Sequence, residues 1–247
     1  KDINNWIFLS SAECNLLDIE QVDKTFQKYK PDIIIHLAAN VGGLYKNMKH
    51  NVEMFSDNIK MNENVFSMCR KYNVNSGIFC GTSCMFPQGP NPGPNPGPNP
   101  NPQSQSYFKP MTEEQIHESP PHPSNEGYAY AKRMLELQCR NYNKQFNTNY
   151  ICLIPVNMYG PNDNYNLEDS HAVPGLIHRL YLAKTTKTPF MMYGTGKPLR
   201  QFLYSYDFAQ IIINITNDYI IDNNRLVKKT IICANDEVSI KELTDII

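Results

Sequence analysis

Short apolar runs alternate with amphipathic stretches along the first part of the chain. The apolar runs, each short enough for a buried strand, are residues 6–9, 32–39, 77–80 and 150–154. The stretches between them repeat apolar positions every three to four residues, as helices do, and cover residues 18–29, 52–72 and 128–142. This alternation predicts βαβ units. We therefore expect an α/β fold with a doubly wound parallel sheet, a Rossmann-like core.

The pattern changes after residue 155, where a long polar loop precedes the next apolar periodicity. Helices are predicted at 173–183 and 206–219, strands at 190–193 and 230–234, a turn at 194–200, and a final helix from Ser239. We expect an NAD(P)-binding core over residues 1–155. Residues 156–247 are then mainly a smaller substrate-binding lobe, interleaved with the core.

Residues 88–106 interrupt the core with Gly-Pro-Asn-Pro repeats and a Gln/Ser tail. Such a segment buries too little apolar surface to offset the entropy of ordering it, so we predict a disordered surface insertion. A polyproline ligand for another domain is the alternative, and no residue of the repeat distinguishes it.

Charge and cysteine content exclude several classes of function. Lys and Arg total 23 against 24 Asp and Glu, with no basic block, so neither nucleic acid nor a membrane surface is an expected partner. No apolar run is long enough to span a bilayer. The seven cysteines are scattered, without a Cys-x-x-Cys pair, which favours reduced thiols in the cytoplasm and no metal site.

Tyr128 and Lys132 stand four residues apart in a predicted helix, and so on one face. An ammonium beside a phenol stabilises the phenolate, which predicts a lowered pKa for Tyr128 and a proton-transfer role. The spacing alone also fits two side chains that share a solvated face.

Ligands of open parallel sheets bind at the carboxyl ends of the strands, so the loops that follow the predicted strands are the candidate site. One of them offers small residues, from Ala38 to Gly43. The next offers Thr82, Ser83 and Cys84, and a third begins near Asn157.

Motifs spread along the chain match one family in order. They are His36-Leu-Ala-Ala39 with Val41-Gly42-Gly43, Gly81-Thr-Ser-Cys84 with Phe86-Pro87, Tyr128-x-x-x-Lys132, Pro155-Val-Asn-Met-Tyr-Gly-Pro161-Asn-Asp-Asn164, Ser170-His171, Val173-Pro174 and Gly194-x-Gly196-x-Pro198-x-Arg200. Together they resemble the GDP-L-fucose synthase family of the extended short-chain dehydrogenase/reductase superfamily. The resemblance runs from about Ser11 to the end of the chain, apart from the insertion.

The resemblance implies epimerisation of GDP-4-keto-6-deoxy-D-mannose at C3 and C5, followed by reduction at C4 with NADPH. It assigns proton donation to Tyr128, with support from Lys132 and the hydroxyl of Thr82. Cys84 is the implied base of epimerisation and His171 the implied acid. The family commonly has Ser where this chain has Thr82, so Ser83 remains an alternative hydroxyl donor.

The implied cofactor is NADP(H). Its implied contacts are Ser11, Ala12, Glu13, Cys14, Asn15, Leu16, Ala38, Ala39, Cys80, Gly81, Thr82, Ser83, Lys132, Pro155, Val156, Asn157, Met158 and His171. Ser10 and Ser11 stand at the end of the predicted second strand, where an acidic residue would favour NAD, so this position favours NADP. The implied substrate contacts are Arg179, Tyr193 and Arg200.

The resemblance also implies a homodimer through the helices at 52–72 and 128–142. It places a Gly-rich phosphate-binding turn before Lys1 and further residues after Ile247, so we expect a fragment that lacks its first βα unit. Two alternatives stay open: another sugar-nucleotide epimerase or dehydratase, which would not need Cys84 with His171, and a non-catalytic dinucleotide-binding pseudoenzyme.

Overall fold

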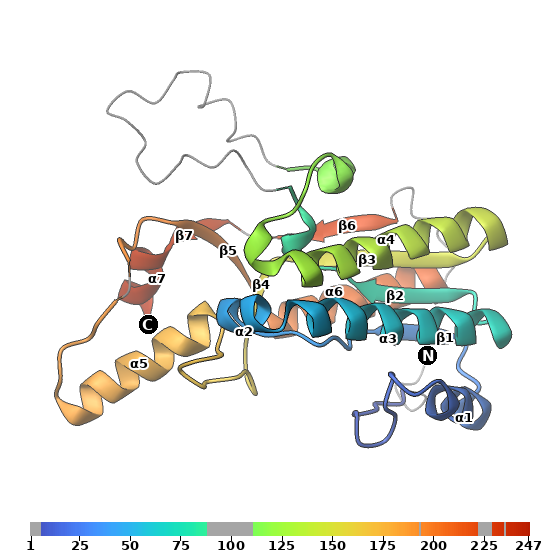
Figure 1. The fold of residues 1–247 in the computed structure, drawn as a ribbon, viewed down its shortest axis with the longest axis horizontal. Helices are drawn as coiled ribbons and strands as arrows, with labels where there is room; N and C mark the ends of the chain where they lie inside the picture. Colours follow the sequence, from blue (N-terminus) through green and yellow to red (C-terminus); the bar gives the residue numbers. More distant parts are fainter. Residues whose placement is uncertain (1–5, 88–110, 193, 222–228, 235) are drawn as a thin grey trace.

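A four-stranded parallel sheet forms the centre of the molecule (Figure 1). The computed structural model describes residues 6–87, 111–192, 194–221, 229–234 and 236–247. The strands lie in the order β1 (Ile33–His36), β2 (Ser76–Cys80), β3 (Asn149–Pro155) and β6 (Thr230–Cys233). The predicted α/β class with a parallel sheet is confirmed.

Parallel pairing brings the carboxyl ends of these strands to one edge. His36 pairs with Phe79, Cys80 with Leu153, and Pro155 with Cys233. The loops that follow the strands therefore start next to one another.

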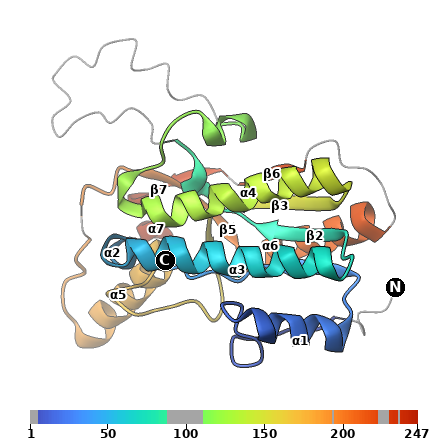
Figure 2. The same cartoon turned by 45° about the vertical axis from the view of Figure 1, so that its right-hand side comes forward.

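Long helices cover both faces of this sheet. On one face, α3 (Asn51–Lys71) and α4 (Glu126–Phe146) lie side by side (Figure 2). The other face is covered by α6 (Ser205–Ile215), which continues as a π-helix over Thr216–Ile221. α1 (Ile19–Tyr29) packs against α3, and its N-cap, Asp18, accepts the backbone N–H groups of Glu20 and Gln21. The sequence predicted this cap.

Alternate residues of the strands fill two separate cores. Under α3 and α4, Phe79 stacks on Phe66 with ring centroids 4.4 Å apart, and Tyr150 completes the aromatic cluster. On the other face, Ile78 and Leu153 pack in the cluster that contains the apolar side of α6. Both faces are apolar, which explains the nearly continuous apolar strands of the sequence.

A smaller lobe lies beyond one end of this sheet (Figure 1). It holds a three-stranded sheet and two helices: β4 (Asn157–Tyr159), β5 (Leu199–Tyr204), β7 (Glu237–Ser239), α5 (Ala172–Thr186) and α7 (Ile240–Ile246). The chain returns from this region to pair β6 with β3, so the two parts are interleaved. A domain boundary at residue 155 stays a prediction.

Short elements complete the described chain. They are α2 (Leu44–Lys49) and the 3₁₀ turns Ser83–Met85, Glu113–His117 and Pro123–Asn125. No helix of the described residues is long and apolar enough to cross a membrane.

Three local predictions were wrong. Residues 6–9 form no strand, and Phe8 is 81% exposed, because no described strand pairs with this run. Residues 190–192 form no strand either, and Tyr193 lies outside the described residues. The turn predicted at 194–200 already enters β5 at Leu199. The predicted insertion at 88–106 lies within the part of the chain that is not described.

His36 is a buried imidazole at the end of β1. Its Nε2 lies 3.0 Å from Oδ1 of Asn62, and its ring meets Phe79 edge-on. Burial, with the nearby Lys132 ammonium, lowers the pKa of His36 from 6.5 to about 4. The folded protein therefore keeps this ring neutral at pH values where the unfolded chain protonates it.

We predict that His36 makes the protein less stable in mild acid. Because the folded pKa is depressed, stability is lost as the pH falls from about 6.5 to about 4, by about 3 kcal/mol in total, with no further loss below. Urea unfolding of wild type and His36→Gln at several pH values measures this. The wild type should lose stability more steeply over this window, and equal slopes would contradict the prediction.

Candidate functional site

Tyr128 and Lys132 project from the first turns of α4 into the molecule. Tyr128 is 8% exposed and Lys132 is 1% exposed. The Lys132 ammonium donates a hydrogen bond of 2.7 Å to the backbone carbonyl of Cys80, at the end of β2. The same ammonium lies 5.9 Å from the centroid of the Tyr128 ring. One buried cation thus joins the helix to the edge of the sheet where ligands are expected.

Three side chains of the candidate site meet in the loop that follows β2. The hydroxyl oxygen of Thr82 accepts the backbone N–H of Cys84 at 3.4 Å and caps the short 3₁₀ turn. The Thr82 side chain also lies close enough to the phenol of Tyr128 and to the thiol of Cys84 to act on the pKa of each, in the direction that lowers it. The structure thus brings together Thr82, Cys84 and Tyr128. No described contact of this kind involves the hydroxyl of Ser83.

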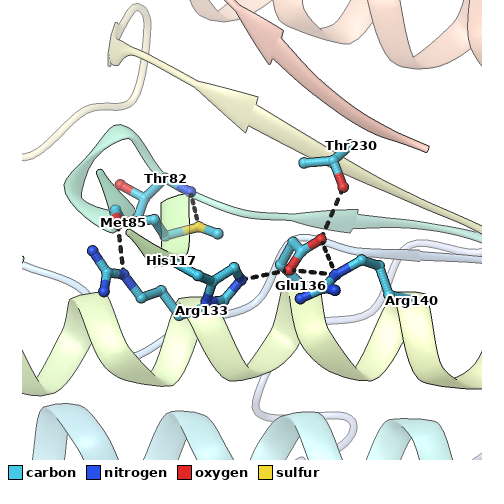
Figure 3. A network of polar contacts seen from close by, with 7 residues as sticks. All are labelled: Thr82, Met85, His117, Arg133, Glu136, Arg140 and Thr230. Carbon is cyan, nitrogen blue, oxygen red and sulfur yellow. Dashed lines mark hydrogen bonds and ion pairs between the residues drawn. The ribbon is translucent and has the colours of Figure 1, made fainter. Parts of the chain in front are cut away.

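Arg133 holds this loop against α4, a role that the sequence analysis missed. Its Nε donates to the backbone carbonyl of Met85 at 2.7 Å, while Sδ of Met85 lies 3.4 Å from the backbone nitrogen of Thr82 (Figure 3). Arg133 is only 4% exposed, although it is charged. The sequence did contain a signal for this role: Arg133 is a charged residue at a position of α4 where the helical period predicts a buried side chain.

A second group of contacts fixes the middle of α4. Glu136 is 3% exposed, and its carboxylate contacts Nε2 of His117 at 2.8 Å and Nε of Arg140 at 2.8 Å, and accepts a hydrogen bond from the hydroxyl of Thr230 at 3.1 Å (Figure 3). These partners come from the 3₁₀ turn after residue 112, from α4 and from β6. The helix that carries Tyr128 is therefore tied to the sheet near its start, through Lys132, and at its middle, through Glu136.

Burial sets the proton affinities of the site. It raises the pKa of the Tyr128 phenol and lowers that of the Lys132 ammonium, because both charged forms lose hydration. The lowered pKa predicted for Tyr128 is thus wrong for this structure. The Lys132 ammonium donates its hydrogen bond to the Cys80 carbonyl. The loss of hydration is therefore the main influence on the pKa of Tyr128. The phenol keeps its proton, as a proton donor must.

The thiol of Cys84 experiences opposing influences. Burial raises its pKa, whereas hydrogen bonds from Thr82 and Asn125 lower it. Cys84 is nevertheless partly exposed, while the other six cysteines are buried, and all seven are free.

His171 lies at the N-cap of α5, and its side chain is exposed and makes no capping bond. The segment before it reaches the loop after β1, where the backbone N–H of Gly43 donates to the carbonyl of Asp169 at 3.3 Å. No described hydrogen bond or ion pair joins His171 to Cys84. The structure therefore brings the loop of His171 to the sheet edge without placing the two side chains in contact.

The residues expected to contact the cofactor lie at the ends of three strands. Ala38 and Ala39 follow β1 and are exposed or half-buried, while Cys80 and Gly81 are buried at the end of β2. After β3, Pro155 and Val156 are buried, whereas the side chains of Asn157 and Met158 are exposed.

The segment from Ser11 to Leu16 precedes α1 as an irregular turn, not as the end of a strand. Apart from Cys14, which is buried, and Leu16, which is half-buried, its residues are exposed: Ser11, Ala12, Glu13 and Asn15. The Glu13 carboxylate accepts the backbone N–H of Ser10 at 2.8 Å and its hydroxyl at 2.9 Å. These bonds lower the pKa of Glu13 and hold its carboxylate within the turn.

The expected substrate contacts belong to the smaller lobe. Arg179 is half-buried on α5, and Arg200 is exposed in β5, with Nη1 donating to the carbonyl of Leu199 at 2.7 Å. Tyr193 lies outside the described residues. No group of three or more His, Cys, Asp or Glu among the described residues is arranged to hold a metal ion.

Residues 4–224 match the NAD dependent epimerase/dehydratase family. The chain belongs to this family. Among its members, a GDP-L-fucose synthase from Dictyostelium discoideum is 45% identical over 214 residues, which cover 87% of this chain and 62% of that relative. A GDP-L-fucose synthase from Sinorhizobium fredii is 31% identical, and the match covers 97% of this chain and 73% of that protein.

A solved structure agrees. The NADP-bound GDP-L-fucose synthetase of Naegleria fowleri superposes with a TM-score of 0.80 at 38% identity, covering 97% of this chain and 72% of that one. The family resemblance seen in the sequence motifs is confirmed. The chain spans slightly less than two thirds of the first curated relatives, 62% for the Dictyostelium protein and 64% for a probable GDP-L-fucose synthase of Drosophila melanogaster.

In this member of the family, Gly127 lets α3 and α4 approach closely beside Tyr128. Its backbone N–H donates to Oδ1 of Asn51 at 2.7 Å, and a Cβ at this position would overlap the carbonyl oxygen of Asn51. A methyl group here would have to push the starts of the two helices apart.

We predict that Gly127→Ala destabilises the fold by about 1–3 kcal/mol, although Ala favours a helix over Gly by about 1 kcal/mol. Urea unfolding measures the change. The matched control is Glu126→Ala, an exposed position in the same turn, which should change stability by less than about 0.5 kcal/mol. A Gly127→Ala protein as stable as wild type would show that the close approach is not needed.

Proposed function

We propose that this chain forms the active site of a GDP-L-fucose synthase that depends on NADPH. The reaction converts GDP-4-keto-6-deoxy-D-mannose to GDP-L-fucose by epimerisation at C3 and C5 and reduction at C4, a step of GDP-fucose biosynthesis. The observation that supports it most is the meeting of Thr82, Cys84 and Tyr128 at the end of β2. A 4-epimerase or a dehydratase needs the hydroxyl and the phenol, but not the thiol.

The chemistry of epimerisation suits these groups. C3 and C5 both flank the C4 ketone, so removal of a proton from either carbon leaves negative charge on the C4 oxygen. Tyr128 and Thr82 supply O–H donors for that oxygen from neighbouring positions. Cys84 takes the proton from carbon as its thiolate, and His171 returns a proton to the opposite face of the sugar.

Reduction uses the same donors. NADPH, when bound, supplies the hydride to C4. Tyr128 gives its phenolic proton to the C4 oxygen, and the buried environment that raises its pKa keeps this proton available at neutral pH.

The donor set of the site fits a dinucleotide. The Lys132 ammonium uses one N–H for the Cys80 carbonyl and retains others for the hydroxyls of a ribose. The small residues Ala38 and Ala39 allow close approach of a cofactor to the backbone after β1. NADP is the preferred form over NAD. Glu13 is the acidic residue nearest to Ser11 along the chain, and its carboxylate is hydrogen-bonded to Ser10 within the turn rather than held free for a ribose hydroxyl. NADP is also the ligand of the Naegleria structure.

Arg179 and Arg200 are proposed to bind the diphosphate of the sugar nucleotide, with Tyr193 beside it. A guanidinium donates two parallel N–H groups to paired phosphate oxygens, which suits this ligand. The seven free cysteines favour a reducing compartment, and we propose the cytoplasm.

A second copy of the chain is the proposed partner. The outer face of α3 and α4 forms a groove lined by Asn51, Val52, Phe55, Ser56, Glu126, Gly127, Tyr130 and Met134. Val52 is 73% exposed and Phe55 is 41% exposed. The groove residues of α4 lie on a different face from Tyr128 and Lys132, so a dimer through this groove leaves the site open.

We predict a division of labour between two variants. The full polypeptide, as wild type and as each variant, is incubated with GDP-4-keto-6-deoxy-D-mannose in D₂O, first without NADPH and then with it. Cys84→Ala should slow deuterium exchange at C3 and C5 by about 100-fold or more, and Tyr128→Phe should mainly slow NADPH oxidation, because each removes one proton-transfer group. Mass spectrometry and NADPH absorbance are the measurements.

Tyr181→Phe, an exposed position on α5, serves as the control and should behave as wild type. If wild type binds NADPH but exchanges and reduces nothing, while another keto or hydroxy sugar nucleotide turns over, the substrate assignment fails. If no sugar nucleotide reacts, the pseudoenzyme alternative is favoured.

The dimer has its own test. Phe55→Glu should shift the mass measured by light scattering from that of two chains to that of one, because a carboxylate in an apolar interface loses hydration without a partner. Tyr181→Glu, which is equally drastic but distant in sequence from the groove, should leave the mass unchanged. A wild-type protein with the mass of one chain would refute the proposed dimer.

A further inference from the structure

Gly43 stands where the loop after β1 enters the short helix α2. Its φ of −64° and ψ of 177° are values that any residue adopts, so the backbone conformation does not require glycine here. The space around it does. A Cβ on Gly43 would lie 2.8 Å from the carbonyl oxygen of Asp169 and 3.1 Å from that of Ser170, the two residues directly before His171.

This close approach permits a backbone contact between two distant parts of the chain. The Gly43 N–H donates to the carbonyl of Asp169 at 3.3 Å, and α2 lies next to the start of α5 (Figure 1). The segment that leads to His171 is thus anchored on the loop after β1. That strand ends beside β2, whose own loop carries Cys84.

Asn47 of α2 holds Gly43 from the other side. Its Nδ2 donates to the carbonyls of Gly42 at 2.8 Å and Gly43 at 3.1 Å, and the residue is only 6% exposed. Its Oδ1 is buried and has no hydrogen-bond partner among the described residues. Reversing the amide would bring this oxygen against two carbonyl oxygens, so the donor side faces the loop. Gly43 is therefore fixed between Asn47 and Asp169.

The first turn of α5 holds the segment before His171 as well. The backbone N–H of Gly175 donates to the carbonyl of His171 at 3.1 Å, and that of Ser170 donates to the carbonyl of Asn166 at 2.9 Å. A Cβ on Gly175 would lie 2.6 Å from the hydroxyl oxygen of Ser170. Because the segment is packed on two sides, a displacement at Gly43 is passed on to His171.

We propose that Gly43, held by Asn47, is a positioning residue for His171, because its missing side chain lets the Asp169–Ser170 backbone dock against the loop after β1. The proposal rests on the proposed function for the role of His171 as the acid of epimerisation. An acid that returns a proton to the face of the sugar opposite Cys84 has to be held at a fixed place relative to the loop after β2.

The stereochemical outcome of epimerisation tests this role. With GDP-4-keto-6-deoxy-D-mannose in D₂O and no NADPH, a deuteron returned by Cys84 restores the configuration, whereas one delivered by His171 inverts it. NMR spectroscopy measures both rates at C3 and C5 for the full polypeptide. Gly43→Ala should slow inversion by roughly tenfold relative to exchange with retention, because a shift of a few tenths of an ångström misplaces the acid.

The ratio of the two rates separates positioning from a structural role. A variant that merely folds less well lowers both rates equally and leaves the ratio as in wild type. Asn47→Ala removes the donor to both carbonyls and should shift the ratio in the same direction as Gly43→Ala, by a smaller factor. It provides a second test that introduces no clash.

Gly42→Ala is the matched control. A Cβ on Gly42 would meet the side chain of Lys46, which can turn away, and not the backbone of another loop. This variant should keep the wild-type ratio. A wild-type ratio in Gly43→Ala, with the fold intact by circular dichroism, overturns the proposal.

Hydrogen–deuterium exchange of the substrate-free polypeptide tests the contact without turnover. Peptides that cover residues 166–175 should lose protection in Gly43→Ala but not in Gly42→Ala, because the N–H groups of Ser170 and Gly175 are bonded within this segment. Unchanged protection in Gly43→Ala overturns the proposal. If wild type neither exchanges nor inverts the sugar while protection is still lost, the proposed function and the role of His171 fail, and the docking of the segment on Gly43 stands.

Discussion

The hydrogen bond between the Lys132 ammonium and the Cys80 carbonyl is the contact on which the site depends. It places a buried cation at the end of β2, where burial would be costly without an acceptor. It also sets the rotation of α4 relative to the sheet, and so the direction of Tyr128, one turn earlier on the same face. Arg133 and Glu136 then fix the loop and the rest of the helix around that contact.

The sheet makes this arrangement possible because its strands are parallel. β1, β2 and β3 end side by side, so the loop after β2, which carries the hydroxyl and the thiol, starts next to the small residues after β1, which are distant in sequence. The helices that cover one face start at the same edge, and Gly127 allows them to meet there without a side chain between them. Precision at the site thus follows from close packing beside it.

Periodicity in the sequence was enough to predict the long helices and the buried strands, since both depend on burial of a continuous apolar face. It failed for residues 6–9, where burial requires a neighbouring strand, and for β4, β5 and β7, whose residues are mostly exposed or half-buried and so give no continuous apolar run. Family motifs pointed to Thr82, Cys84 and Tyr128. Arg133 was missed because its role depends on which atom its side chain reaches, which spacing does not encode.

Burial gives the site its chemical character and also a difficulty. It raises the pKa of Tyr128, which suits a group that must hold a proton until charge develops on a neighbouring oxygen. It raises the pKa of Cys84 as well, which opposes the thiolate that a base requires. The same desolvation therefore helps one group and hinders the other. At the thiol, interactions with the side chains of Thr82 and Asn125 act against burial and favour the thiolate.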